Sequence, residues 1–260
     1  MSKWLKRIYL FLIYAFLYAP IIVLIVFSFN EGRTRGSWNG FSLHWYESLF
    51  QNDEIMSALK NTLSVATIAT IVSTILGTLG AIGIYEFRAN RRRVILALNQ
   101  IPVINPDIVA AVGFMVLYRT LTLDSGYLTL VLSHIAFTVP YVVLSVLPKL
   151  RQMPRAYTEA AMDLGATPMQ TLRLVVLPQI KTGIISGALM AFTLSIDDFV
   201  ISFFTTGNGV ETVSTMVYSM ARRGINPEIN ALSTLMFGAM LILMILMNVM
   251  TGVKGEKNEK

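Results

Sequence analysis

Six long apolar stretches constrain the fold of this chain more than any other feature of its sequence. Each has about the 20 mostly apolar residues that a helix needs to cross a bilayer, and they cover residues 8–29, 61–85, 94–118, 127–148, 182–204 and 230–251. They account for a hydrophobic content of 54% against 14% charged residues, and for a mean hydropathy of +0.61. We therefore expect an integral membrane protein with six spans.

Lipid offers no hydrogen bonds to the backbone, so these spans must be α-helices, and their length excludes the short alternating strands of a barrel. The fold class expected is an all-α bundle. We expect residues 1–60 to hold the first transmembrane helix and an outer loop, 61–251 the transmembrane core, and 252–260 a tail. Gly77, Gly80 and Gly83 put small residues near one face of the second span, which predicts close helix packing there.

The basic residues are distributed unevenly between the loops. Of the 21 Lys and Arg residues, 15 lie in the two terminal segments and in the loops after the second and fourth spans. By the positive-inside rule, both termini and the loop 149–181 face the cytosol, with the tail 252–260. The net charge of +6 is thereby explained by membrane orientation, and no nucleic-acid partner is expected.

The N-terminal Lys3, Lys6 and Arg7 precede an apolar run, as in a cleaved signal peptide. However, the run to Phe29 is longer than a usual signal-peptide core, and no small-x-small cleavage site follows before Asn30. We expect a retained first helix.

Several kinds of chemistry are not indicated. The chain has no cysteine, and His44 and His134 lie too far apart in sequence for a metal-ligand pattern. The phosphate-binding pattern G-x-x-x-x-G-K-[ST] does not occur. We expect no metal, no cofactor and no catalytic residue.

The loop between Pro154 and Pro178 has the signals of two short helices. Pro154 suits a first helical position, Gly165 can adopt the left-handed conformation that ends a helix, and Thr167 can cap a second helix. We expect that helix to end near Leu177, because Pro178 cannot donate a backbone hydrogen bond. Such a helix-Gly-helix finger would dock a partner through Glu159, or alternatively lie on the membrane surface.

Three acidic residues fall inside predicted spans, where a charge is costly and usually faces a pathway. Asp107 lies in the third span, and Asp197 and Asp198 in the fifth, at similar predicted depth. Ser195, Asp198, Ser202 and Thr205 follow the spacing of one helical stripe. Because neither span contains Lys or Arg, the acids favour a cationic substrate over an anion.

Two alternatives to a pathway remain open for these acids. Asp107 would simply cap a helix that restarts after Pro106. One of Asp197 and Asp198 would be protonated, or paired with an Arg of a sister subunit.

The loop pattern, with Val175 in place of the usual Ile, resembles the EAA motif of type I ABC importer permeases; it reads Glu159-Ala160-Ala161-x3-Gly165-x9-Val175-x-Leu177-Pro178. The resemblance implies a permease bundle in which 154–165 is a coupling helix that enters a cleft on an ATPase homodimer. The coupling residues would be Glu159, Ala160, Ala161, Asp163, Gly165, Leu177 and Pro178. A second homologous permease and an extracytoplasmic binding protein would complete the transporter.

A narrower resemblance, to spermidine/putrescine permease subunits, runs over nearly the whole chain; it is carried by residues 18–21, 106–109, 159–166, 192–200 and 226–231. It implies that a polyamine passes near Asp197 and Asp198. Tyr141 and Phe199 are candidates for cation–π contacts with its ammonium groups. The rival hypotheses are another cargo for the same importer class, a secondary cation transporter, and a membrane enzyme.

Overall fold

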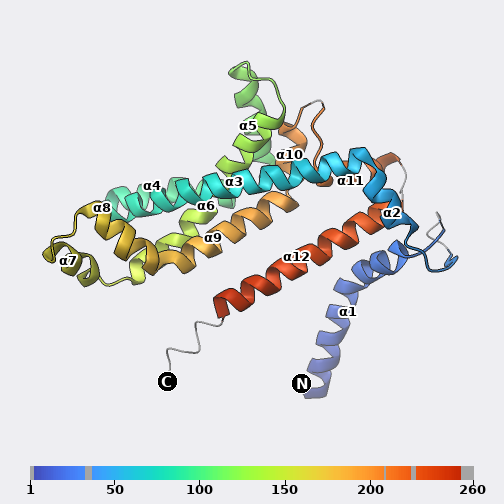
Figure 1. Cartoon of the computed structure of the whole chain (residues 1–260), viewed down its shortest axis with the longest axis horizontal. Coiled ribbons are helices and arrows are strands. Elements are labelled where there is room, and N and C mark those ends of the chain that lie inside the picture. The colour runs from blue at the N-terminus through green and yellow to red at the C-terminus, as the bar shows by residue number, and fades with distance from the viewer. Residues whose placement is uncertain (1–2, 33–36, 208, 224–226, 253–260) are drawn as a thin grey trace. The chain divides into compact units, whose positions relative to one another are not determined.

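The computed structural model describes residues 3–32, 37–207, 209–223 and 227–252, and the regular elements in these ranges are helices, apart from an isolated bridge between Asn30 and Phe41. The chain is therefore all-helical over these ranges, as predicted (Figure 1). The elements are α1 (Lys3–Ser28), α2 (His44–Gln51), α3 (Asp53–Glu86), α4 (Ala89–Ile104), α5 (Asp107–Thr120), α6 (Tyr127–Gln152), α7 (Ala156–Asp163), α8 (Pro168–Thr171), the π-helix η1 (Leu172–Val176), α9 (Leu177–Asp197), α10 (Val200–Thr205), α11 (Val213–Arg223) and α12 (Glu228–Gly252).

Within the described residues, four helical runs are long and apolar enough to cross a membrane, namely Trp4–Ser28, Asp53–Glu86, Tyr127–Gln152 and Pro168–Asp197. The bent pair α4 and α5 adds a fifth if it is counted as one span. The predicted sixth span coincides with α12, whose apolar part over the described side chains, Glu228–Ile242, is shorter than a full crossing. The predicted tail lies almost entirely outside the described residues.

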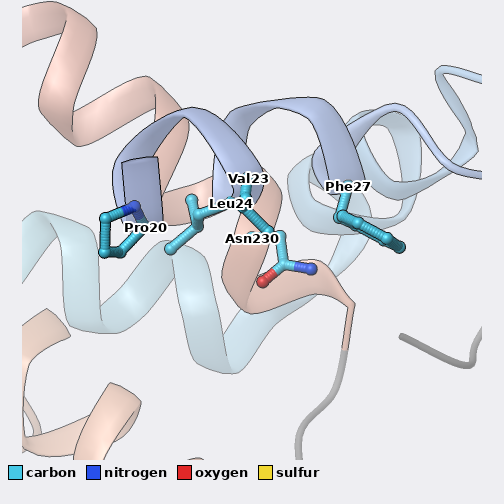
Figure 2. A pocket seen from close by; sticks show the side chains of 5 residues that line it. All are labelled: Pro20, Val23, Leu24, Phe27 and Asn230. Carbon is cyan, nitrogen blue, oxygen red and sulfur yellow. The ribbon is translucent and has the colours of Figure 1, made fainter. Parts of the chain in front are cut away.

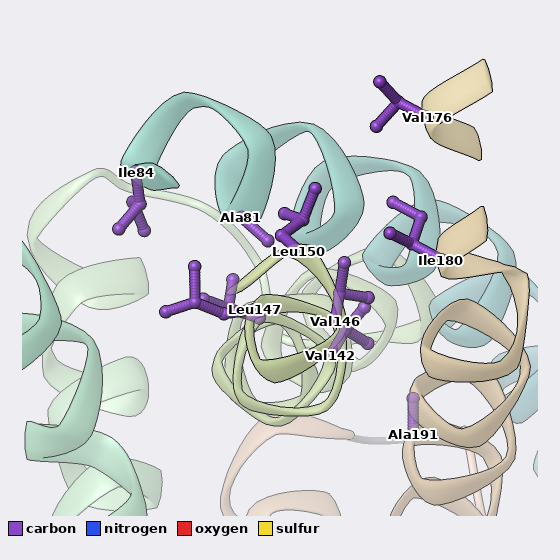
Figure 3. Close-up of a cluster of buried hydrophobic side chains, with 10 residues drawn as sticks. Ala81, Ile84, Val142, Val146, Leu147, Leu150, Val176, Ile180 and Ala191 are labelled. Atoms are coloured by element: carbon purple, nitrogen blue, oxygen red, sulfur yellow. The ribbon is translucent and has the colours of Figure 1, made fainter. Parts of the chain in front are cut away.

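The chain divides into two units, which are described separately: a larger one, Ala58–Thr215, and a smaller one, Met1–Ser57 with Met216–Lys260. In the larger unit, α6 packs between α3 and α9 (Figure 3). The core consists of Ala81, Ile84, Val142, Val143, Val146, Leu147, Leu150, Val176, Ile180 and Ala191.

Glycines let both neighbouring helices approach α6 closely. A Cβ on Gly77 of α3 would lie 2.6 Å from the Val142 Cβ, and one on Gly187 of α9 would lie 3.2 Å from the Val142 Cα. The predicted close packing of α3 is thus found at Gly77. It is not found at Gly83, where an added Cβ would meet nothing within 4 Å.

In the smaller unit, α1 and α12 are in contact and line a cavity of about 190 Å³ (Figure 2). Its walls are Pro20, Val23, Leu24, Phe27 and Asn230. The buried Trp45 of α2 donates its indole N–H to the Asn30 carbonyl at 2.7 Å, which holds α2 near the end of α1. α2 also bonds to α12, because Ser48 and Asn52 donate to the carboxylate of Glu228.

Candidate functional site

The first break in a predicted span lies between α4 and α5. The two helices are bent by 102°, and Asn105 and Pro106 between them have extended backbone, with ψ of 146° and 136°. Proline has no N–H to donate and disfavours helical geometry in the preceding residue, so the turn falls here. The predicted span 94–118 is therefore broken, and the alternative of a helix that restarts after Pro106 is found, with Asp107 as the first residue of the new helix. The N-cap position is Pro106, and no side-chain bond caps this helix.

The second break separates α9 from α10. α9 ends at Asp197, Asp198 is extended with a ψ of 126°, and α10 begins at Val200. The Asp198 carboxylate accepts the backbone N–H groups of Ile201 at 3.2 Å and Ser202 at 2.7 Å, so it caps the start of α10. The predicted fifth span, 182–204, is interrupted here. The single helical stripe from Ser195 to Thr205 is consequently wrong as well.

Three of the four residues predicted for that stripe nevertheless meet, around His134 of α6. The Nδ1 of His134 lies 2.7 Å from the Ser195 hydroxyl, and its Nε2 lies 3.1 Å from the Ser202 hydroxyl. The same Nε2 is 3.6 Å from Oδ2 of Asp198. Thr205 lies elsewhere, with its carbonyl bonded to the hydroxyl of Thr129.

The predicted acids occupy different environments. Asp197 is exposed, whereas the side chain of Asp198 is only 5% exposed. Asp107 is exposed at the start of α5, and Tyr141 of α6 is partly buried. Phe199 contacts Phe203, with ring centroids 5.5 Å apart.

The two broken segments converge on one stretch of α6. Ala111 of α5, Phe137 of α6 and Ile201 of α10 form one buried cluster, against which Tyr141 and Leu194 pack. Asp107, Tyr141 and the α9–α10 break are thus brought to one region, although they are distant in sequence.

His134 was not among the residues predicted for the pathway, because its sequence position was considered only for metal binding. A signal was available, because His134 lies inside the predicted span 127–148 and a polar side chain in a span usually faces the bundle interior. The ring is 2% exposed.

The loop after α6 has the helix end and the helix start that its sequence indicates at Gly165 and Thr167. α7 ends at Asp163, and Gly165 after it has a φ of +89°; the N–H groups of Gly165 and Ala166 bond to the carbonyls of Met162 and Ala161. This pair of bonds is a Schellman motif. Thr167 then starts α8 through reciprocal bonds with Gln170.

The predicted end of the second helix near Leu177 is wrong. The chain stays helical from Pro168 to Asp197, and the five residues before Leu177 form the π-helix η1. A proline removes one backbone bond and crowds the carbonyl four residues earlier, and the wider π-turn lies just where Pro178 would do so. Leu177 and Pro178 consequently begin the membrane helix α9 instead of ending the finger.

The finger is open to solvent along α7. None of its residues is buried, and Glu159, Ala160, Asp163 and Gly165 are exposed. Leu164 is 89% exposed. Glu159 also lines a cavity of about 480 Å³, together with Glu86 and Tyr85 of α3, which the sequence had not indicated.

A family model for the binding-protein-dependent transport system inner membrane component matches residues 73–253. The chain belongs to this family, and it is accordingly a multi-pass membrane component of such a system and not its ATP-hydrolysing enzyme.

Similar proteins include the spermidine/putrescine transport system permease protein PotC of Haemophilus influenzae, 37% identical over 95% of this chain and 96% of that protein. The putrescine transport system permease protein PotI of Escherichia coli is 39% identical over 93% and 88%.

Among solved structures, a permease of a bacterial ABC transporter that imports alginate has a TM-score of 0.72 at 19% identity, covering 98% of this chain and 97% of that chain. A chain of the MetNI methionine transporter has a TM-score of 0.65 at 18% identity, covering 78% and 98%. At these identities, the likeness concerns the fold.

Proposed function

We propose that this chain is a permease subunit of an ATP-driven type I ABC importer that carries spermidine or putrescine into the cytoplasm. The observation that carries this proposal is the 37% identity to a spermidine/putrescine permease over 95% of the chain. Both lengths are covered almost completely, so the similarity extends over the loops and helix breaks as well as the apolar spans.

The electrostatics of the α9–α10 break support a cationic cargo. Asp197 is exposed at the C-terminal end of α9, where the helix dipole and the last backbone carbonyls already favour a positive charge. Residues 182–204 contain no Lys or Arg. An alkylammonium group is attracted to such an end, with Ser195, Ser202 and Asp198 as supporting groups and Asp107, Tyr141 and Phe199 as further candidates along the path.

We place six spans in the membrane with both termini in the cytosol, on the distribution of Lys and Arg. The transmembrane core then covers 61–251, the first helix and outer loop 1–60, and the tail 252–260, with the loop 149–181 on the ATPase side. Tags at the two termini, tested for accessibility in intact cells, check this orientation.

The finger couples this chain to an ATPase homodimer. Glu159 faces solvent on a helix without buried residues, next to the very exposed Leu164. A carboxylate beside apolar groups suits a groove that offers an Arg or Lys. A second homologous permease forms the other half of the pathway, an extracytoplasmic binding protein delivers the polyamine, and the pair alternates between inward-open and outward-open states.

Uptake of labelled spermidine by source cells with and without this gene tests the function. Loss of energy-dependent, putrescine-competed uptake on deletion, restored by the cloned gene, is the expected result. Uptake that survives ATP depletion but still needs the gene indicates a secondary transporter. Unchanged uptake in cells without a redundant system indicates another cargo.

A further inference from the structure

The break between α9 and α10 is held by one buried side chain from another helix. His134 of α6 touches the last turn of α9 through Ser195, the first turn of α10 through Ser202, and the break itself through Asp198. One side chain of α6 thus links both helices that flank the break.

The proton positions in this network follow from chemistry. Asp198 as a carboxylate only accepts, so the Ser202 hydroxyl donates its single proton to Asp198, whose Oδ2 lies at 3.0 Å and whose backbone carbonyl lies at 3.4 Å. Ser202 can then only accept from His134, which makes Nε2 the donor. In a neutral imidazole, Nδ1 is consequently the acceptor and takes the proton of Ser195. In this one arrangement, each polar side chain of the network Ser195–His134–Ser202–Asp198 has a hydrogen-bond partner.

Asp198 has little capacity left for a cargo ion. Its carboxylate already accepts two backbone N–H groups and one hydroxyl, and its backbone carbonyl accepts the hydroxyl of Ser214 at 2.6 Å. Its exposed neighbour Asp197 has no such set of donors among the described residues.

We propose that His134 is a positioning residue for transport: it holds Asp198 as the cap of α10, and the break so fixed presents Asp197, and not Asp198, to the polyamine. The identity of the cargo rests on the proposed function, whereas the role of His134 in fixing the break does not.

The alternative is a purely structural role, in which His134 only fills space in the core. The two accounts differ for His134→Leu, which keeps most of the volume and removes both hydrogen bonds. If His134 only fills space, His134→Leu leaves uptake unchanged. If His134 positions the break, His134→Leu impairs uptake. His134→Gln, whose amide both donates and accepts, then keeps much of the uptake.

The uptake experiment uses the whole transporter expressed in cells, with the amount of assembled complex measured for each variant. We expect H134L to raise the KM for spermidine about tenfold and H134Q to stay within about threefold of wild type, in line with hydrogen bonds to a charged group. In a D198N background, H134L adds less than about twofold, because both changes remove one interaction. The control is H44Q at the other histidine, which is exposed on α2.

A second readout needs no cargo. The chain has no cysteine, so Ile201→Cys supplies the only thiol, at a fully buried position in the first turn of α10. With His134 present, the thiol is protected from N-ethylmaleimide. In H134L, it reacts about tenfold faster, because the turn opens locally when its cap is released.

The outcomes separate the two proposals. Wild-type uptake and labelling in H134L overturn the positioning role, as does an H134Q variant that is as impaired as H134L. Faster labelling in H134L without any polyamine transport by the wild type supports the positioning of the break and overturns the cargo.

Discussion

Asp197 and Asp198 are neighbours in sequence, yet their carboxylates lie in opposite environments. Asp198 is 5% exposed and bonded to the first turn of α10, whereas Asp197 is exposed at the end of α9. A helix break between them produces this difference, because the extended backbone at Asp198 turns successive side chains to opposite sides.

We expect Asp197→Asn to raise the KM for spermidine about tenfold and to leave the amount of assembled transporter unchanged. The change removes one charge from residues 182–204, which contain no Lys or Arg, and a hydrogen bond to a charged group contributes about 1.5–3 kcal/mol. Initial uptake rates over a range of spermidine concentrations measure it.

Asp124→Asn is the matched control, since Asp124 is also exposed but lies in the loop between α5 and α6. A D197N transporter with unchanged KM contradicts the assignment of Asp197 to the pathway.

We expect Glu159→Lys to abolish ATP-driven uptake while membrane insertion stays intact. Glu159 is exposed on α7, a helix without buried residues, so the substitution leaves the core intact, but it reverses the charge offered to the ATPase. Uptake and co-purification of the ATPase with the permease are measured together.

The control for added charge is Gln152→Lys, at the exposed end of α6. Normal uptake by E159K, with the ATPase still bound, removes the docking role of α7.

At Gly165, we expect the order of stability to be Gly, then Asn, then Ala, then Val. Its φ of +89° is a conformation that L residues rarely adopt, and an added Cβ would meet nothing within 4 Å. The cost is therefore conformational, about 1–2 kcal/mol for Ala, and smaller for Asn, which tolerates positive φ.

Thermal denaturation of the purified complex, followed together with its transport-coupled ATPase rate, gives this order. Equal behaviour of the Ala, Val and wild-type proteins means that the finger does not keep this turn in the assembled transporter.

Two glycines of α3 make a matched pair for packing. Gly77→Ala places a Cβ at 2.6 Å from Val142, and overpacking of this kind costs about 1–3 kcal/mol. Gly83→Ala meets no neighbour and improves helix propensity, so no loss is expected. Melting temperatures in detergent compare the two, and a G83A variant as unstable as G77A refutes the contact at Val142.

Features set by local sequence were predictable. The end of α7 is determined by Gly165 and the start of α8 by Thr167, because their capping bonds reach only a few residues along the chain. Four of the six apolar stretches, 8–29, 61–85, 127–148 and 182–204, fall at least in part in described helices that are long and apolar enough to cross a bilayer, and the length that a crossing needs made them predictable.

Three other features were not predicted: two depend on which of several local hydrogen-bond patterns the backbone adopts, and one depends on a contact between distant helices. Pro178 was expected to end a helix, but the π-turn before it lets the helix continue. Asp198 was placed on a helical stripe, because periodicity cannot show that its carboxylate prefers the N–H groups of the next turn. His134 is invisible to spacing arguments, since it meets Ser195 and Ser202 only when α6 packs on α9.

The most direct test of the central claim is spermidine accumulation in proteoliposomes that contain the complete transporter, with its binding protein outside and ATP inside. The account predicts accumulation that requires ATP hydrolysis, is competed by putrescine, and is lost with Glu159→Lys. Accumulation that proceeds without ATP, or a complex that hydrolyses ATP in response to its binding protein but moves no polyamine, would contradict it.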